Sequence, residues 1–286
     1  MRYERPDTIE DATRLLEGAK GGAFVLAGGT DLLVKMKSDA FEAELVVDIK
    51  SIAGMAEITD TKDNFVIGAA VPCAALSENA ALVAAWPGVV EAANLIGSTQ
   101  VQGRCTMVGN LCNASPAADS VPALVAANAK VRITGPDGTR VVTVQDIPLS
   151  PGKTSLKPGE IIEAVVLEKR AAHSGDAYLR FIPRTEMDIA VVGAAVNLTL
   201  DSEGVVQAAR VALGAVAPTV VLSQEAAAAI IGTKLEDAAL GALAAACAAA
   251  CNPIDDKRGT IEFRKQVAGV LAGRAARAAY DRAGGK

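Results

Sequence analysis

The sequence has 286 residues, of which 51% are hydrophobic and 21% are charged, and its formal net charge is −5. This length and composition predict a globular protein with a sizeable core and two or three subdomains. The acidic balance disfavours a nucleic-acid partner, because phosphate binding needs a basic surface. The N-terminus has no apolar signal region and no run of about 18 residues is apolar enough to span a membrane, so we expect a cytoplasmic protein without a transmembrane segment.

Cysteine and histidine usage limits the metal chemistry of the chain. The cysteine count of 5 is odd and accompanies no secretion signal, which predicts free thiols in a reducing compartment. Cys105 and Cys112 have the spacing Cys-x6-Cys, which is not an iron–sulfur pattern. His173 is the only histidine and lies in a polar turn, which disfavours a Ser-His-Asp triad and a multi-histidine metal site. We therefore predict no metal site on this chain.

The N-terminal segment predicts a small α/β lobe. Thr8 is a suitable N-cap for a helix over 8–17 that ends at Gly18. The apolar patterns that follow predict a strand over 23–27, a helix from 31 and a strand over 45–49.

A second lobe is predicted from about residue 52 onward. Gly135-Pro136-Asp137-Gly138 is a strong hairpin turn. The predicted elements are a strand at 65–69, helices at 72–84 and 88–96, a small-residue loop, a helix at 120–128, hairpin strands at 131–134 and 141–144, and a strand at 161–167.

A boundary is predicted at 171–176, where the residues are small, polar and turn-forming. An antiparallel meander over 178–183, 189–200 and 205–213 should follow, and then helices at 223–231, 235–251 and 260–281. The basic residues of the last helix predict a solvated face opposite an alanine-rich packing face; they are Arg264, Lys265, Arg274, Arg277 and Arg282.

Residues 24–37 carry the first candidate binding segment. The short apolar run 24–27 predicts a buried strand, and it ends at Gly28-Gly29. Thr30 or Asp31 is a suitable N-cap for the helix that follows. Strand, glycine pair and helix start together suit a diphosphate, because glycine lets the backbone approach the anion and free N–H groups point at it. A tight turn that binds nothing is the equally weighted alternative.

Residues 103–122 form the second candidate segment. Small residues crowd it, charges are few, and a helix should begin near Asp119 or Ser120 with Pro122 in its first turn. A backbone of this composition suits close wrapping around a large polar ligand. Two such segments in one chain favour a ligand with two ends, such as a dinucleotide.

Six motifs in order then give a family resemblance. The chain resembles the FAD-binding medium subunit of the molybdenum hydroxylases, the xanthine dehydrogenase and aerobic carbon monoxide dehydrogenase family, over essentially its whole length. The motifs lie at 27–31, 106–119, 159–162, 184–190, 214–219 and 253–258.

The resemblance implies an α+β fold. A two-lobed FAD-binding domain, similar to that of p-cresol methylhydroxylase and vanillyl-alcohol oxidase, should precede a smaller α/β C-terminal domain with an antiparallel sheet and helices. The implied limits are 1–55 for the first lobe, 56–172 for the second lobe and 173–286 for the C-terminal domain.

The resemblance also implies which residues hold FAD. Asp119 corresponds to a carboxylate on flavin or ribityl hydroxyls, although a helix N-cap is an alternative role. Arg180 corresponds to a basic position near the flavin, and a strand-face ion pair is its alternative. The implied cofactor-binding residues are Val25, Leu26, Ala27, Gly28, Gly29, Thr30, Asp31, Leu32, Thr106, Met107, Val108, Gly109, Asn110, Ser115, Asp119, Ile162 and Arg180.

Three single positions qualify the resemblance. The family usually has a second glycine where this chain has Val108, and valine resists positive φ and adds two methyl groups. Ile189 lies in the segment that packs near the flavin face in relatives, with ordinary strand core as its alternative. His173 lies away from both binding segments, so we expect non-covalent FAD and a solvated loop position for this histidine.

The implied function is electron exit from a three-component hydroxylase. This chain would take electrons from an iron–sulfur small subunit, through FAD, to NAD+, a quinone or O2. Molybdopterin and [2Fe-2S] are expected only on the partner subunits, in a dimer of heterotrimers, with no catalytic acid or base on this chain. The alternatives are a stand-alone FAD-dependent oxidase or reductase and a flavin-less structural subunit.

Overall fold

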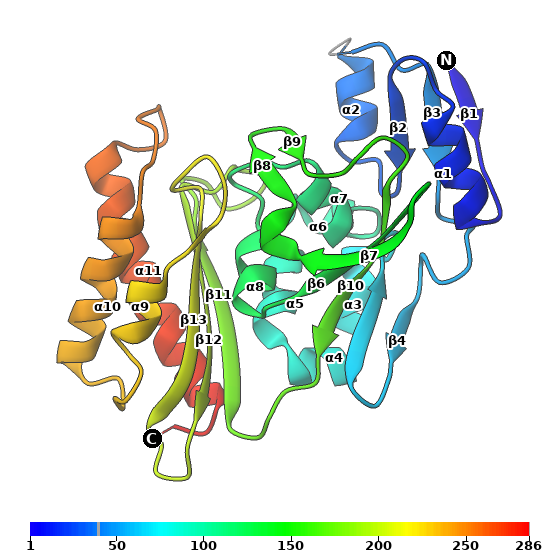
Figure 1. The fold of residues 1–286 in the computed structure, drawn as a ribbon. Coiled ribbons are helices and arrows are strands. Elements are labelled where there is room, and N and C mark those ends of the chain that lie inside the picture. Colours follow the sequence, from blue (N-terminus) through cyan, green and yellow to red (C-terminus); the bar gives the residue numbers. More distant parts are fainter. Residues whose placement is uncertain (39–40, 286) are drawn as a thin grey trace.

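The computed structural model describes residues 1–38 and 41–285. Figure 1 shows three parts in chain order: a small N-terminal lobe, a central part, and a C-terminal sheet covered by long helices. Within the described ranges, no helix combines the length and the apolar character that crossing a membrane requires.

A parallel sheet forms the N-terminal lobe. Its strands are β1 (Arg2–Glu4), β2 (Ala23–Leu26) and β3 (Leu45–Asp48), in the order β1-β3-β2. Helix α1 (Ile9–Glu17) joins the first two, and α2 (Leu32–Lys37) leads toward the third. The Thr8 hydroxyl accepts a hydrogen bond from the Asp11 N–H, which confirms the predicted cap. The sequence analysis missed β1, because three polar residues carry no hydrophobic pattern.

The central sheet is antiparallel and has the order β4-β5-β10-β6-β7. The predicted hairpin is confirmed, since Gly135 pairs with Gly138 at its tip. The strands are β4 (Ile58–Asp60), β5 (Asn64–Gly68), β6 (Lys130–Gly135), β7 (Gly138–Thr143) and β10 (Ile161–Glu168), while η1 (Val144–Asp146), β8 (Pro148–Ser150) and β9 (Lys153–Thr154) lie between β7 and β10.

Helices pack against this sheet, and two sequence predictions about them are wrong. The single helix predicted at 72–84 is broken at Asn79, whose side chain accepts a hydrogen bond from the Leu82 N–H at 2.9 Å and so starts a new helix. The loop predicted after residue 103 contains a short helix. The helices are α3 (Cys73–Glu78), α4 (Ala80–Ala85), α5 (Pro87–Asn94), α6 (Thr99–Gln102), α7 (Met107–Cys112) and α8 (Ser120–Ala126).

The C-terminal sheet is the predicted antiparallel meander. Its order is β11-β12-β13-β14, with strands β11 (Ser174–Phe181), β12 (Val192–Leu200), β13 (Val206–Gly214) and β14 (Val221–Leu222). The first strand starts at Ser174, within the predicted boundary turn, because its polar first residues still pair in register with the end of β12. Helices α9 (Gln224–Ala228), α10 (Asp237–Ala250) and α11 (Ile261–Arg282) follow.

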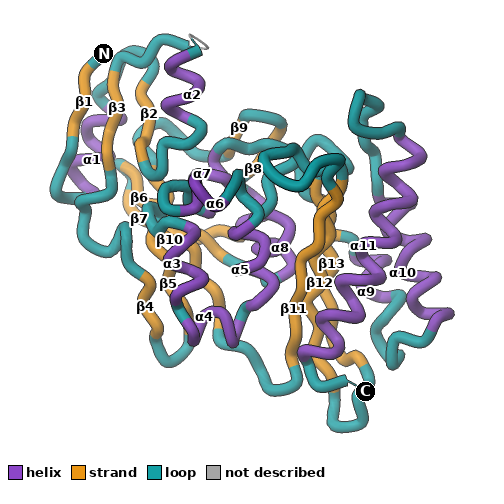
Figure 2. The backbone as a smooth tube through the Cα atoms, turned by 180° about the vertical axis from the view of Figure 1, so that it is seen from behind, coloured by secondary structure: helices purple, strands orange, loops and turns teal. Residues whose placement is uncertain are grey.

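Both faces of the C-terminal sheet are covered. Helix α11 packs on β11 and β12, with α10 beside it, whereas α5 and α8 of the central part pack on the opposite face. Figure 2 shows the same layers from behind. The protein therefore has two buried cores, one under the first two sheets and one between the C-terminal sheet and its helices.

The prediction of a solvated basic face on α11 is wrong for Arg264, whereas Arg282 is exposed as predicted. Arg264 is 3% exposed, and its guanidinium donates to the Val191 carbonyl and to Asp256, each at 2.7 Å. Arg282 reaches the central part and pairs with Glu91 of α5. These contacts join positions far apart in the sequence, so helical periodicity could not indicate them.

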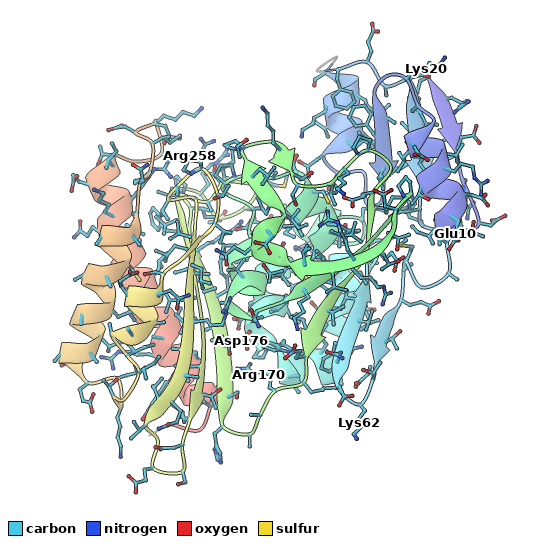
Figure 3. All side chains as sticks on the ribbon, viewed as in Figure 1. Glu10, Lys20, Lys62, Arg170, Asp176 and Arg258 are labelled. Carbon is cyan, nitrogen blue, oxygen red and sulfur yellow. The ribbon has the colours of Figure 1, made fainter. Side chains whose placement is uncertain are left out.

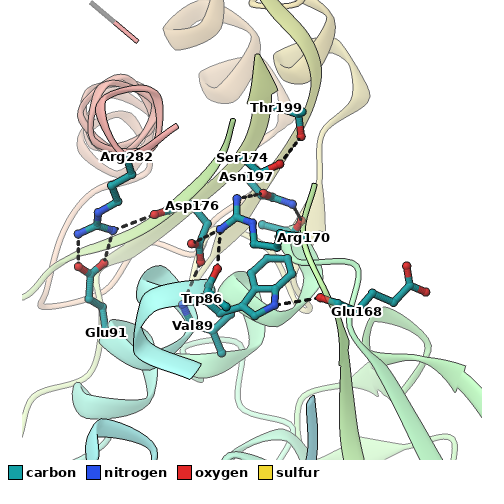
Figure 4. A network of polar contacts seen from close by, with 12 residues as sticks. Trp86, Val89, Glu91, Glu168, Arg170, Ser174, Asp176, Asn197, Thr199 and Arg282 are labelled. Atoms are coloured by element: carbon teal, nitrogen blue, oxygen red, sulfur yellow. Dashed lines mark hydrogen bonds and ion pairs between the residues drawn. The ribbon is translucent and has the colours of Figure 1, made fainter. Parts of the chain in front are cut away.

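A polar network fastens the C-terminal sheet to the central helices (Figures 3 and 4). Arg170 pairs with Asp176 at 2.7 Å and donates to the Asn197 side chain at 2.8 Å. Its guanidinium lies 4.4 Å from the ring centre of Trp86. Asp176 also accepts the Val89 N–H at the start of α5. Because this network is largely buried, it fixes how the last sheet sits on the rest.

Candidate functional site

A cavity of about 440 Å³ lies between the N-terminal lobe and the central part. Three segments form its wall: the end of β2 with the turn and helix after it, the residues around α7, and the chain from 152 to 162. The lining residues include Phe24, Val25, Ala27, Gly28, Gly29, Thr30, Asp31, Leu32, Lys35, Phe41, Ile96, Cys105, Thr106, Val108, Gly109, Asn110, Cys112, Asn113, Leu156, Glu160 and Ile162.

The glycine pair brings the two parts together at this cavity. Gly28 lies against the backbone of the central part, where a Cβ atom would be 2.1 Å from the Arg104 carbonyl oxygen. Gly29 has φ of +77°, a conformation that strains any residue with a side chain. The backbone N–H groups from Gly28 to Asp31 donate to no other described residue. The turn thus presents a row of free donors to the cavity.

Thr106 and Asn110 shape the second segment. The Thr106 hydroxyl caps α7 by accepting from the Gly109 N–H at 2.9 Å. The Asn110 side-chain oxygen accepts from the Ser120 N–H and hydroxyl, at 3.1 and 2.7 Å, and so ties α7 to α8. These bonds hold a short helix against the cavity, where the sequence analysis expected only loop.

Val108 lies in the first turn of α7, and its φ is not positive. A β-branched residue is accepted in this backbone conformation, so the valine imposes no reshaping of the segment. Its side chain is 7% exposed and contributes apolar surface to the cavity wall.

The structure brings most of the predicted site residues to this one cavity. Ile162 reaches it from β10, and the glycine segment and α7 supply the others. The predicted residues in the wall are Val25, Ala27, Gly28, Gly29, Thr30, Asp31, Leu32, Thr106, Val108, Gly109, Asn110 and Ile162, whereas Leu26, Met107, Ser115, Asp119 and Arg180 are not part of it.

Asp119 and Arg180 lie together behind the cavity as a buried ion pair. The Arg180 guanidinium donates to an Asp119 carboxylate oxygen at 2.7 Å and to the Leu95 carbonyl at 2.8 Å, one residue before the cavity-lining Ile96. Tyr178 donates its hydroxyl to the other Asp119 oxygen at 3.2 Å. Asp119 makes no helix-capping bond with its side chain. Arg180 Nε is buried without a partner among the described residues.

Burial controls the protonation of this carboxylate. Removal from water raises the pKa of Asp119 to about 6, and the facing Arg180 charge opposes that rise. The same desolvation, with the adjacent carboxylate, raises the pKa of the Tyr178 hydroxyl, which stays a donor. The cluster therefore holds one arginine charge beside a carboxylate that titrates near neutral pH.

Sequence reasoning missed Lys35, which lines the cavity from α2. Its amine donates to the Asn113 side-chain oxygen at 2.5 Å, and the Asn113 amide donates to Asp31 at 3.3 Å. Helical spacing gave a signal, because Lys35 is four residues after Asp31 and so lies on the same helix face. The aromatic pair Phe24 and Phe41, stacked with ring centres 4.2 Å apart, was also missed.

Two further expectations can be compared with the structure. Ile189 is 51% exposed and precedes β12, so the strand-core alternative is wrong for it, and it does not line the cavity. His173 is an exposed turn residue with φ of +56°, and a solvated loop position was expected for it.

In the described part of the chain, no three His, Cys, Asp or Glu side chains converge as metal ligands would.

Comparison with known proteins decides the family. Residues 1–167 match the family described as the FAD binding domain in molybdopterin dehydrogenase. Residues 177–279 match the CO dehydrogenase flavoprotein C-terminal domain. This chain belongs to the FAD-binding medium-subunit family of the molybdenum hydroxylases.

Relatives and solved structures of this medium-subunit family match over nearly the whole chain. The carbon monoxide dehydrogenase medium chain of Afipia carboxidovorans is 34% identical, over 98% of this chain and 97% of the relative. A putative xanthine dehydrogenase FAD-binding subunit of Escherichia coli is 31% identical, over 99% and 97%. The reconstituted CO dehydrogenase from Oligotropha carboxidovorans superposes with a TM-score of 0.93 at 33% identity, over 98% and 97%.

The family membership agrees with the resemblance in the sequence. The chain is an oxidoreductase subunit of the FAD-binding type, with an FAD-binding domain followed by a C-terminal domain built on an antiparallel sheet. Its relatives are named as the medium chain of carbon monoxide dehydrogenase and as an FAD-binding subunit of xanthine dehydrogenase, so each is one subunit of a larger enzyme.

Proposed function

We propose that the cavity between the N-terminal lobe and the central part holds FAD without a covalent link. The observation that carries this proposal is the meeting of two segments, far apart in the sequence, on one cavity to which each presents polar backbone groups. The free N–H groups from Gly28 to Asp31 are suitable donors for a diphosphate. The donor set therefore fits the dinucleotide that the family binds.

The predicted residues divide by the group that they would hold. Residues 25–32 and 106–110 would hold the diphosphate through the backbone, and Ile162 would meet the ring system. Ser115, Asp119 and Arg180 lie outside the cavity wall, so they would act on FAD indirectly, through the residues that line the wall. Arg180 lies behind Leu95 and Ile96 and is paired with Asp119, so its positive charge would favour negative charge on the cofactor most when Asp119 is protonated, below about pH 6.

Bound FAD would supply two-electron redox chemistry, taking electrons from an iron–sulfur partner and giving them to NAD+, a quinone or O2. The residues of this chain would bind the cofactor, orient it and exclude water. None of them is required to accept or donate a substrate proton, because substrate oxidation belongs to the molybdenum subunit.

The proposal extends to assembly and location. The chain would act in the cytoplasm as one member of a heterotrimer with an iron–sulfur small subunit and a molybdopterin large subunit, and two heterotrimers would form a dimer. Its division would be 1–55 and 56–172 for the two FAD-binding lobes and 173–286 for the C-terminal domain. The second hydrophobic core, which is built only from residues 177–283, supports the last boundary.

The test is the absorption spectrum of the full chain purified with its co-expressed partner subunits, followed by acid release of the chromophore. We expect a flavin spectrum and the release of intact FAD into the acid supernatant. A colourless protein that does not bind added FAD would refute the proposal. Flavin that stays with the acid precipitate would refute the non-covalent link.

A further inference from the structure

The cavity wall is poor in positive charge. Among the described residues that line it, Lys35 is the only one with a cationic side chain, and Asp31 and Glu160 are acidic. Glu160 is neutralised from outside the wall, since Arg140 donates two hydrogen bonds to it at 2.8 Å. Arg140 also lowers the pKa of Glu160. Asp31 forms no ion pair within the described residues and accepts a hydrogen bond from the Asn113 amide at 3.3 Å.

Lys35 is placed to face the glycine turn. A helical side chain covers the surface over the turn that precedes its own Cα, and for Lys35 that turn holds Asp31 and Leu32. Its amine contacts Asn113, at the end of α7, so the side chain crosses from the N-terminal lobe to the central part. The described part of the chain offers this amine a neutral amide oxygen and no carboxylate partner, so its charge is available to a ligand.

A diphosphate adds two negative charges to this cavity. Backbone N–H groups supply hydrogen bonds and partial charges but no net charge, and the Asp31 carboxylate would repel the ligand. We propose that Lys35 is the charge-compensating contact for the diphosphate of FAD, and that its bond to Asn113 is the position it takes when no anion is bound. This inference rests on the proposed FAD site and adds a residue that the family motifs do not contain.

The experiment compares Lys35→Met with Lys37→Met in the full chain. Lys37 is a matched control, because it is an exposed lysine of the same helix that does not line the cavity. FAD and riboflavin are each titrated into the flavin-depleted proteins, and binding is followed by flavin fluorescence at several NaCl concentrations. Lys35→Arg, which keeps the charge, is included as a conservative variant.

We expect Lys35→Met to weaken FAD binding about tenfold, as for the loss of one partly exposed charge-assisted contact. Its FAD affinity should also depend less steeply on salt than that of the wild type. Riboflavin binding should not change, since riboflavin has no phosphate. Lys37→Met should match the wild type, and Lys35→Arg should keep most of the affinity.

Two results would overturn the inference while leaving the FAD site intact. One is equal FAD affinity in the two methionine variants. The other is a Lys35→Met loss that is the same for FAD and riboflavin and has an unchanged salt dependence. Failure of the wild-type protein to bind FAD would instead refute the proposed function itself, and it would be seen before any substitution is compared.

Discussion

Gly28 shows how one residue without a side chain sets the geometry of the site. The approach of the glycine turn to the backbone at residue 104 closes the cavity floor between two parts of the chain. Gly103 has no such role: a Cβ atom there would meet nothing within 4 Å, and its φ is −70°. Close backbone approach thus requires glycine at position 28, as it does at Gly68 and Gly175 elsewhere in the fold, whereas Gly103 has space for a side chain.

Gly28→Ala should therefore be costly. The added methyl group would lie 2.1 Å from the Arg104 carbonyl, so the turn must shift. We expect a loss of about 2 kcal/mol in the free energy of unfolding and strongly weakened FAD binding. Thermal denaturation and flavin titration would measure the two effects. Gly103→Ala is the control and should change neither, and a Gly28→Ala protein that binds FAD normally would contradict the cavity geometry.

Asp119 gives the protein a predictable pH dependence. Its pKa is about 6 in the folded protein and ordinarily near 3.8, so the folded state holds this proton more tightly. The stabilisation is fully present below pH 3.8 and is lost as the pH rises through about 6, a change of roughly 3 kcal/mol. Urea unfolding between pH 4 and 7 should show this slope in the wild type. The slope should be smaller in Asp119→Asn, where Asp176, whose pKa is also raised by burial, keeps its own contribution.

Asp201 serves as a control, because its pKa is shifted in the opposite direction to that of Asp119. The Val205 and Glu203 N–H groups lower the pKa of this exposed carboxyl, so its stabilisation is present above the ordinary value and is lost as the pH falls. Asp201→Asn should keep the slope between pH 4 and 7 and change only the acid limb. If Asp119→Asn has the same slope as the wild type, the raised pKa is refuted.

At the scale of elements, side-chain caps decide where the short helices begin. Asn79 ends α3 and starts α4, and Thr106 starts α7 beside the cavity. Each accepts one backbone N–H bond of 2.9 Å. The two caps are chemically alike and differ in place, because only Thr106 lines the cavity.

This pair separates helix stability from cofactor binding. Thr106→Ala and Asn79→Ala should each lower the free energy of unfolding by about 1 kcal/mol, the usual value of a lost N-cap. Only Thr106→Ala should also weaken FAD binding, because it loosens α7 at the cavity. Chemical denaturation and FAD titration of both variants provide the measurement. Equal FAD affinities would show that α7 does not need its cap to hold the cofactor.

At the scale of the whole molecule, the C-terminal sheet is held by charges as well as by apolar packing. Arg170 and Asp176 are 9% and 6% exposed in their side chains, whereas Arg282 and Glu91 are 35% and 39% exposed. Burial raises the pKa of Asp176, and Arg170 opposes this rise. Loss of one partner of the buried Arg170–Asp176 pair should therefore lower the stability strongly. The Arg282–Glu91 pair is screened by water, so its loss should matter less.

Arg170→Met should destabilise the protein by about 3–5 kcal/mol, because it leaves Asp176 buried without its charge partner. Arg282→Met should cost at most about 1 kcal/mol. Adding Asp176→Asn to Arg170→Met should recover part of the loss, since the unpaired charge is then removed. Calorimetric unfolding of the four proteins tests this order, and an equal effect of the two arginine variants would contradict it.

The sequence by itself determined the backbone plan and the family. The cap at Thr8, the hairpin at 135–138, the C-terminal meander and the two small-residue segments all follow from local spacing, which reports backbone conformation directly. Local spacing could not find β1, whose short polar sequence becomes a strand only by pairing with the buried β3. Local spacing also predicted one continuous helix over 72–84. The Asn79 side chain instead accepts the Leu82 N–H, which ends one helix and starts another.

Only the tertiary structure decided which charged groups meet. Arg264 fits a solvated helix face by periodicity and is nevertheless buried, and the exposed Arg282 reaches across to Glu91 of α5. Asp119 meets Arg180 behind the cavity, and Lys35 meets Asn113 across it. The physical reason is that the position of a charged residue in the sequence does not indicate which distant residue it will pair with. Its environment is set by whichever distant segment the folded chain places within a few ångströms, and the electrostatics of the site follow from that placement.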